Sequence, residues 1–338
     1  MDQDRSPAIP TLRTIRANVE QHLSHFVHET KERWPAPGGS DAIDPVIKAL
    51  GSGGKRLRPV LTVVGHLVAG GSAQGSILAT AGAWELLHTM ALIHDDIMDS
   101  SAKRRGRPSL HVTEGIAGAV LTGDLAHALA DELFLSASFD SALISKAGSF
   151  WNRAKLDTAV GQSLDLSTSP QDVTPEIASE IARLKTASYS TVGPLQTGAA
   201  LGGAPEELLN AVSQIGVEIG VAFQFLNDLE GFGPEGGQVD VLRGSPSILL
   251  AESLERSDEA GRRLLTSMWG RPSLTTDEVS AVTETIDQSG ASEAVASRVS
   301  TLVGDAARRV RLLPDNNGRS LLEEVLETQF GLENGKAD

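Results

Sequence analysis

The sequence predicts an all-α protein, and three observations point to that class. Apolar residues recur at helical spacing, three and four positions apart, along most of the 338-residue chain. No good stretch alternates apolar and polar residues as a half-buried strand does. Aromatic residues make up only 4% of the chain, with a single Tyr, which is poor material for a β protein. Apolar residues make up 40% of the chain, enough for a large core.

The N-terminal half is expected to form helices separated by turn signals. Pro35–Gly39 follows the first expected helix, and Gly70–Ser72 separates the second from the third. Each segment combines Ala, Leu, Glu and Arg with apolar residues at i, i+3 and i+4. The expected helices are 13–33, 59–69, 74–99, 116–139 and 142–164.

The C-terminal half continues the same pattern. Ser167–Thr174 is a turn, and Thr174 followed by Pro175 is typical of a helix start, with Thr as N-cap and Pro at the first helical position. The expected helices are 175–202, 205–231, 246–269, 276–288, 291–312 and 317–330. Because the connections are short and no long linker interrupts them, we expect one all-α domain over residues 1–338, frayed at 1–12 and 331–338.

Composition excludes several classes of function. The chain has 44 Asp and Glu against 29 Lys and Arg, a net charge of −15, which argues against a general nucleic-acid binder. It has no Cys, so disulfides, thiolate catalysis and zinc–thiolate sites are excluded. The best apolar run, Pro59 to Gly70, is interrupted by His66 and is shorter than the roughly 20 residues of a membrane span. No signal peptide is apparent, so we expect a cytoplasmic protein.

An acidic turn lies inside an apolar segment at 92–99, where the sequence reads LIHDDIMD. On a helix, Asp95 and Asp99 stack on one face and Asp96 lies about 100° away. Three carboxylates in one turn repel each other, and burying them without a partner is costly. A hard cation such as Mg²⁺, which takes its other ligands from water and phosphate oxygens, resolves both problems. The alternative is an exposed acidic stripe, which the apolar flanks disfavour.

Two basic runs accompany this turn. They read GGKRLRP at 53–59 and KRRGRP at 103–108. Glycines allow close backbone approach, and Arg guanidiniums match phosphate oxygens. Either run alone is usually a solvated face, but both beside an acidic metal-type motif predict ligands with two highly charged phosphate groups. One group would be held by metal and the other by Arg and Lys.

A weaker signal is FQFLNDLEG at 223–231. Asn227 offers a neutral oxygen, and Asp228 and Glu230 offer charge. The same residues are also typical of a helix end before Gly231, so on their own they do not decide between a ligand site and a cap.

Together the motifs resemble the trans-isoprenyl diphosphate synthase (polyprenyl synthetase) family over nearly the whole chain. The matching motifs are GGKRLRP (53–59), LIHDDIMD (92–99), RRGRPSLH (104–111), GD (123–124), GQSLDL (161–166), KT (185–186) and FQFLND (223–228). The resemblance implies a helical bundle around a central active-site cavity and a homodimer. It also implies Mg²⁺-dependent condensation of isopentenyl diphosphate with an allylic diphosphate, using two to three Mg²⁺ ions.

The resemblance assigns roles to individual residues. Asp95 and Asp99 would bind Mg²⁺ on the allylic diphosphate, with Asp96 assisting, and Arg104 would contact that diphosphate. The diphosphate of isopentenyl diphosphate would be held by Lys55, Arg58, His88 and Arg105.

Further roles fall on the C-terminal half. The developing allylic cation would be lined by Lys185, Thr186 and Gln224, and Lys185 would also contact the allylic diphosphate. Asp228 would carry a third Mg²⁺. Additional support for the metal side would come from Gln162, Asp165 and Asn227.

This chain departs from the family pattern in its second aspartate-rich motif. The usual DDxxD reads Asn227-Asp228-Leu229-Glu230-Gly231, and the two lysines of the following loop are replaced by Gln238 and Ser245. Three interpretations follow: a synthase with weaker allylic affinity, a partly disabled subunit of a hetero-oligomer, or a class I terpene cyclase.

The cyclase interpretation rests on Asn227, Asp228, Gly231 and Glu235, which fit the loose metal-binding pattern of those enzymes. Against it, Pro234 should break the helix before Glu235. A cyclase also needs no isopentenyl diphosphate site, yet the basic residues of that site are present. The synthase is therefore favoured.

Product length is predicted from the residues four and five places before Asp95, which form the floor of the elongation pocket in the family. Here they are Ala91 and Met90, and neither is aromatic. The expected product is geranylgeranyl diphosphate (C20), with farnesyl diphosphate (C15) second.

Overall fold

The structure is a computed structural model that describes residues 10–34, 38–51, 53–232, 241, 243–271 and 273–331. The all-α prediction is confirmed: helices make up most of the described chain, and the only sheet in it is a two-stranded ribbon. The chain divides into two compact units. Unit 1 is Met1–Ser149, Pro194–Leu209 and Pro314–Leu322, and unit 2 is Phe150–Gly193, Asn210–Leu313 and Glu323–Asp338. The single domain remains a prediction.

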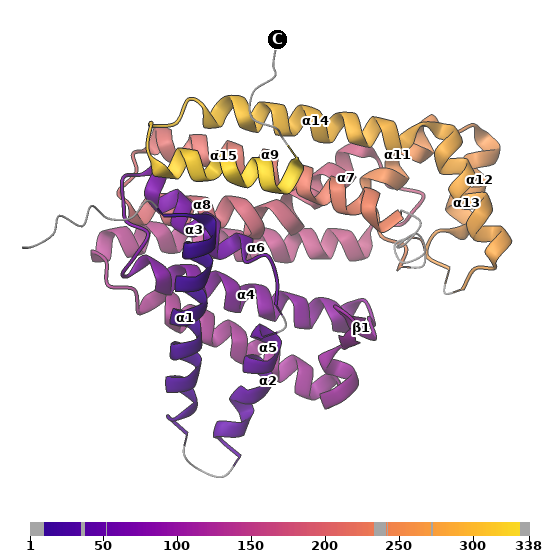
Figure 1. Ribbon diagram of the computed structural model, residues 1–338. Coiled ribbons are helices and arrows are strands. Elements are labelled where there is room, and N and C mark those ends of the chain that lie inside the picture. The colour runs from indigo at the N-terminus through magenta and orange to yellow at the C-terminus, as the bar shows by residue number, and fades with distance from the viewer. Residues whose placement is uncertain are drawn as a thin grey trace, which may run out of the picture. The chain divides into compact units, whose positions relative to one another are not determined.

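Unit 1 is built around one helix that is apolar on all sides. Ala81, Trp84 and Leu86 of this helix, α4 (Ile77–Met98), are fully buried. Helix α5 runs alongside it and α1 packs across it (Figure 1). The other elements wholly in unit 1 are α1 (Leu12–Lys31), η1 (Ser40–Ile43), α2 (Asp44–Leu50), α3 (Leu57–Val68), β1 (Lys103–Arg104), β2 (Arg107–Pro108) and α5 (Leu110–Leu135).

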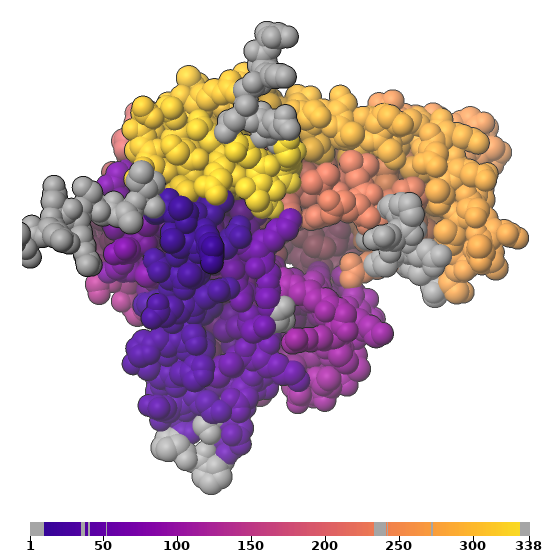
Figure 2. All heavy atoms as spheres, viewed as in Figure 1, coloured from indigo at the N-terminus to yellow at the C-terminus, as the bar shows by residue number. Residues whose placement is uncertain are grey.

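Helix α1 lies on the surface of unit 1 (Figure 2) and buries a single apolar stripe. The buried residues are three or four positions apart, as the helical period requires: Leu12, Ile15, Val19, Leu23, Val27 and Thr30. The helix starts at a capping box formed by Thr11 and Thr14. This cap lies inside the stretch 1–12 that we expected to be frayed, and residues 1–9 and 332–338 lie outside the described residues.

Unit 2 has its own apolar core. Phe225, Leu250, Trp269, Ile286 and Val295 are among its buried members. Helices α12 and α13 pack against each other (Figure 1). The elements wholly in unit 2 are α7 (Pro175–Ile181), η2 (Ala182–Val192), α11 (Ile248–Arg256), α12 (Glu259–Met268), α13 (Thr276–Ser289) and α14 (Ala291–Val310). Helices with residues in both units are α6 (Ser141–Ser167), α8 (Gly193–Leu201), α9 (Glu206–Phe232) and α15 (Asn317–Phe330).

Several predicted boundaries were wrong. The segment 246–269 is two helices, because Ser257 is extended and Asp258 caps a new helix. The segment 175–202 contains a π-helix, η2. Helix α3 begins at Leu57, two residues before Pro59, and helix α2 was missed altogether.

The region 103–108 forms a ribbon where no strand was expected. Helix α5 begins at Leu110 instead of 116, with a kink at Gly115, where φ is 72°. One described helix, α9, is long and apolar enough to cross a membrane by length and composition, but half of its most apolar stretch is buried inside the protein. Core helices pass the same test.

Candidate active site

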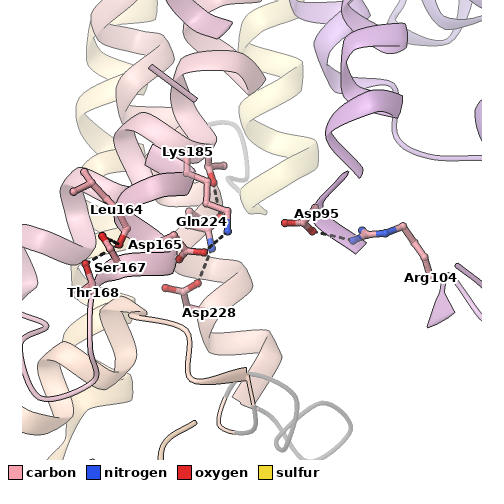
Figure 3. A network of polar contacts seen from close by, with 10 residues as sticks. Asp95, Arg104, Leu164, Asp165, Ser167, Thr168, Lys185, Gln224 and Asp228 are labelled. Atoms are coloured by element: carbon pink, nitrogen blue, oxygen red, sulfur yellow. Dashed lines mark hydrogen bonds and ion pairs between the residues drawn. The ribbon is translucent and has the colours of Figure 1, made fainter. Parts of the chain in front are cut away.

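The acidic turn lies at the C-terminal end of α4. Asp96 is buried, Asp95 is half-buried, and Asp99 is the C-cap residue. The helix dipole places partial negative charge at this end, which disfavours carboxylates. Cations are therefore needed here, and one is present: Arg104 Nη2 lies 3.0 Å from Asp95 Oδ2 (Figure 3), and Arg104 Nε lies 2.8 Å from Asp96 Oδ1.

The chemistry of these donors fits Mg²⁺. Carboxylate oxygens are the hard ligands that this ion prefers. Among the described residues, no group of three or more His, Asp or Glu side chains is arranged to hold an ion. Asp95 and Asp99 would therefore hold Mg²⁺ together with water and phosphate oxygens, which is how this ion is usually bound in phosphate sites.

Arg104 is carried by a tight hairpin, residues 103–108. Strand β1 pairs with β2 in antiparallel register, and the two loop residues are Arg105 and Gly106. Both have positive φ, 52° and 75°, as the favoured two-residue hairpin turn requires. Arg105 Nη1 donates a hydrogen bond to the carbonyl of Gly53. The structure therefore brings the two basic runs into contact.

Arg56 anchors the first basic run. Its backbone is left-handed, with φ of 50°, at the N-cap of α3. Its guanidinium pairs with buried Glu85. It also donates a hydrogen bond to Glu20 Oε1 at 3.1 Å and another to the carbonyl of Leu50 at 2.8 Å. Burial disfavours the charge, but the two carboxylates outweigh it and raise the pKa of Arg56. Sequence reasoning missed Glu85, although an acidic residue in the run AWELL was a usable signal.

A cavity of about 230 Å³ in unit 1 adjoins both motifs. His88 and Arg105 line it, as do Asp96 and Arg104. Lys55 and Arg58 are not among its lining residues. The charge of Arg58 nevertheless reaches His88: burial first, and then the guanidiniums of Arg58 and Arg105, hold the pKa of His88 well below its ordinary value. The imidazole is therefore neutral at pH 7.

In unit 2, the predicted residues form a connected polar network. Thr186 Oγ1 donates to Gln224 Oε1 at 2.7 Å, and Gln224 Nε2 donates to Asp228 Oδ1 at 2.7 Å (Figure 3). Asp228 Oδ2 accepts the backbone N–H of Ile248 at 3.0 Å. The orientation of the Gln224 amide is therefore determined on both sides, and the network joins η2, α9 and the start of α11.

Lys185 and Asp165 form a second contact in unit 2, with Nζ 2.5 Å from Oδ2 (Figure 3). Gly161 makes this approach possible, because a Cβ there would lie 2.7 Å from Lys185 Cα. The π-helical winding of η2 spans Lys185 and Thr186, and such windings are common at functional sites. Gln162 Nε2 is buried and has no hydrogen-bond partner among the described residues.

A cavity of about 300 Å³ in unit 2 is lined by Lys185, Asp228 and Asn227. Ser245 also lines it, so the uncharged replacement of a family lysine faces this cavity. Sequence reasoning missed Arg243, which adds a cation to the wall two residues from Ser245. Gln238, Pro234 and Glu235 lie outside the described residues.

The comparisons with known proteins agree with this arrangement. A family model described as polyprenyl synthetase matches residues 41–286. The geranylgeranyl diphosphate synthase of Methanosarcina mazei is 28% identical over 95% of this chain and 99% of its own. The geranylfarnesyl diphosphate synthase of Aeropyrum pernix is 31% identical over 91% of this chain and 97% of its own.

A solved structure gives the same result. The geranylgeranyl pyrophosphate synthase of Corynebacterium glutamicum, complexed with isoprenyl diphosphate and magnesium, superposes with a TM-score of 0.86 and 26% identity, covering 95% of this chain and 99% of its own. The chain therefore belongs to the polyprenyl synthetase family, and it is a short-chain trans-prenyltransferase.

Proposed function

We propose that this prenyltransferase makes geranylgeranyl diphosphate, the C20 product, by adding isopentenyl diphosphate to an allylic diphosphate. The observation that supports this most directly is the arrangement in unit 1. Arg104 is held by Asp95 and Asp96 beside a cavity that His88 and Arg105 also line. Carboxylates for a metal and cations for a diphosphate thus lie within one compact region.

The reaction begins when the C–O bond of the allylic diphosphate breaks and the diphosphate leaves with the electron pair. Asp95 and Asp99 would hold Mg²⁺ on this group with help from Asp96, and bound magnesium would supply Lewis-acid stabilisation of the leaving charge. Arg104 adds its own charge to the same diphosphate.

Isopentenyl diphosphate binds through cations and one neutral donor. Lys55, Arg58 and Arg105 supply charge, and His88 supplies an uncharged N–H because its pKa is low. The alkene electrons of isopentenyl diphosphate form the new C–C bond to the allylic cation. A proton then leaves the adjacent carbon, and the released diphosphate accepts it.

We assign the roles at the allylic cation to residues of unit 2. Lys185, Thr186 and Gln224 line the cation, and the determined orientation of the Gln224 amide keeps its oxygen with Thr186. Asp228 would hold a third Mg²⁺, with Asp165 and Asn227 as further oxygen donors. Arg243 offsets the charge that Ser245 lacks.

The floor of the product pocket is assigned to Met90 and Ala91, which lie one turn before Asp95 and are half-buried. Neither side chain is aromatic, so the pocket admits a C20 chain.

The protein acts in the cytoplasm as a homodimer. Helix α5 supports the dimer, because it exposes large apolar side chains that a second copy would cover. Ile116 is 64% exposed, Leu121 60% and Val120 39%.

The test is an incubation of the purified chain with Mg²⁺, isopentenyl diphosphate and dimethylallyl, geranyl or farnesyl diphosphate. We expect C20 diphosphate as the main product, and no product from Asp95→Ala. A hydrocarbon formed from an allylic diphosphate alone would identify a cyclase. Activity only after addition of a partner chain would identify a disabled subunit.

A further inference from the structure

The arginine hairpin carries a cation that the assignment above leaves without a role. In the antiparallel register of the ribbon, Arg104 pairs with Arg107, and Lys103 pairs with Pro108. Directly opposite residues of a two-stranded ribbon project to the same face. Arg107 therefore shares the face of Arg104. Lys103, which precedes Arg104 in the chain, shares the face of Pro108 instead.

Two like charges directly opposite each other destabilise a ribbon unless an anion lies between or beside them. Arg104 is already paired with Asp95 and Asp96. Arg107 is exposed, and it lines the cavity of about 230 Å³ together with Arg104 and Arg105. The hairpin thus directs a second guanidinium to the wall of this cavity.

The charge balance of the cavity wall favours an anion. Its cationic residues in the described chain are Lys48, Arg56, Arg104, Arg105 and Arg107, and its carboxylates are Glu85 and Asp96. Arg56 is paired with Glu85, and Arg104 with Asp96. Positive charge remains after these pairs are formed, and a diphosphate is the kind of ligand that would neutralise it.

Ser109 is an independent indication at the same place. It lies two residues after Arg107, lines the cavity, and is only 2% exposed. It is the N-cap residue of α5, yet its hydroxyl makes no capping bond. Its Oγ is buried with no hydrogen-bond partner in the described part of the chain. A buried hydroxyl without a partner costs free energy that a bound ligand oxygen would return.

We propose that Arg107 and Ser109 are part of the isopentenyl diphosphate site and bind its diphosphate group, the guanidinium by charge and the hydroxyl as a donor. This rests on the proposed function, since it adds residues to the site that His88 and Arg105 define there. Neither residue contacts the reacting carbon atoms, so both act on substrate affinity and leave the chemical step unchanged.

The experiment compares Arg107→Gln with Lys103→Gln, which removes the same charge from the same hairpin on a residue outside the cavity wall. Steady-state kinetics are measured at low, constant ionic strength with each substrate varied in turn. We expect Arg107→Gln to raise the KM for isopentenyl diphosphate about tenfold or more, as the loss of one charged contact does. In Arg107→Gln, the KM for the allylic substrate and kcat should each change less than about twofold. In Lys103→Gln, kcat and both KM values should change less than about twofold.

Ser109→Ala should raise the same KM about threefold and leave Tm unchanged or slightly higher, because the buried hydroxyl makes no bond in the free protein. Equal KM values for isopentenyl diphosphate in Arg107→Gln and Lys103→Gln would overturn the proposal. An equal rise in the KM of both substrates would overturn the assignment to isopentenyl diphosphate.

A binding measurement separates this inference from the proposed function. If the wild-type chain does not consume isopentenyl diphosphate, the proposed function fails. Titration calorimetry then measures the affinity of the anion site for inorganic pyrophosphate, independently of any reaction. Weaker binding by Arg107→Gln than by Lys103→Gln supports the site, and equal binding by the two variants refutes it.

Discussion

Replacing Glu85 with Gln tests whether the buried ion pair beneath the first basic run stabilises the protein. Arg56 has two carboxylate partners that differ mainly in burial: the Glu85 side chain is 6% exposed and the Glu20 side chain is 54% exposed. The substitutions Glu85→Gln and Glu20→Gln therefore make the same chemical change to the same guanidinium. Only the surroundings of the lost charge differ.

The expected magnitudes follow from burial. Breaking a buried pair leaves an uncompensated charge and costs about 3–5 kcal/mol, whereas an exposed pair contributes about 0–1 kcal/mol. Because Arg56 keeps Glu20 and the carbonyl of Leu50 as partners, we expect Glu85→Gln to lower the free energy of unfolding by the smaller value in this range, about 3 kcal/mol. With an unfolding entropy of about 2.1 cal/mol/K per residue, this lowers Tm by about 4 °C in a chain of this length. Glu20→Gln should cost less than about 1 kcal/mol.

The assay is urea unfolding at pH 7 followed by tryptophan fluorescence, since Trp84 is fully buried beside Glu85. A double variant, Arg56→Met with Glu85→Leu, should regain much of the loss, because an apolar pair of similar volume has no charge to desolvate. Equal costs for Glu85→Gln and Glu20→Gln would refute the reasoning. So would a double variant less stable than Glu85→Gln.

Three further predictions concern packing, pH and assembly. Gly161→Ala should lose about 2 kcal/mol or more of stability and most of kcat, because the new Cβ meets the backbone at Lys185. The control Gly148→Ala lies in the same helix with its nearest atom at 3.8 Å, so it should be neutral or slightly stabilising in the same urea assay. Equal effects of the two substitutions would contradict the close approach at Gly161. Burial lowers the pKa of His66 and of His88 below the ordinary 6.5, so the unfolded chain binds more protons and stability should fall as pH drops below about 6.5, by at most about 1.4 kcal/mol per pH unit for each group. Urea unfolding from pH 8 to pH 5 measures this, and a His66→Gln variant with an unchanged pH slope would exclude that residue as a cause. Ile116→Asp should convert the dimer to a monomer in sedimentation equilibrium, and a wild-type chain that sediments as a monomer would refute the homodimer.

Much of the helical architecture could be predicted because it depends on a local period. Helix α15 matches its expected range of 317–330, and the start of α7 at Pro175 follows the Thr174 cap. Errors fell where local signals compete. Ser257 and Asp258 divide a continuous apolar pattern, because a capping side chain satisfies the N–H groups of a new helix. The hairpin at 103–108 was missed because two-residue strands are too short to show alternation.

Some motif residues proved to be structural. Gly123 of the GD motif accommodates the His94 ring, since a Cβ there would lie 2.5 Å from the ring carbon Cδ2. Asp124 lies 3.8 Å from His94 Nε2. The motif could be matched from the sequence, but its contact with the helix that carries Asp95 could not, because Gly123 lies 29 positions after His94 in the chain.

The sequence by itself determined the fold class, the acidic turn and the basic runs, because helical periodicity and the spacing of charged residues are properties of neighbouring positions. Only the tertiary structure decided which charges meet. It paired Arg104 with Asp95 and Asp96, used Arg56 to anchor its own turn, and oriented Gln224 between Thr186 and Asp228. These pairings join residues up to 38 positions apart, and they depend on where the backbone places each side chain and on what remains exposed to water.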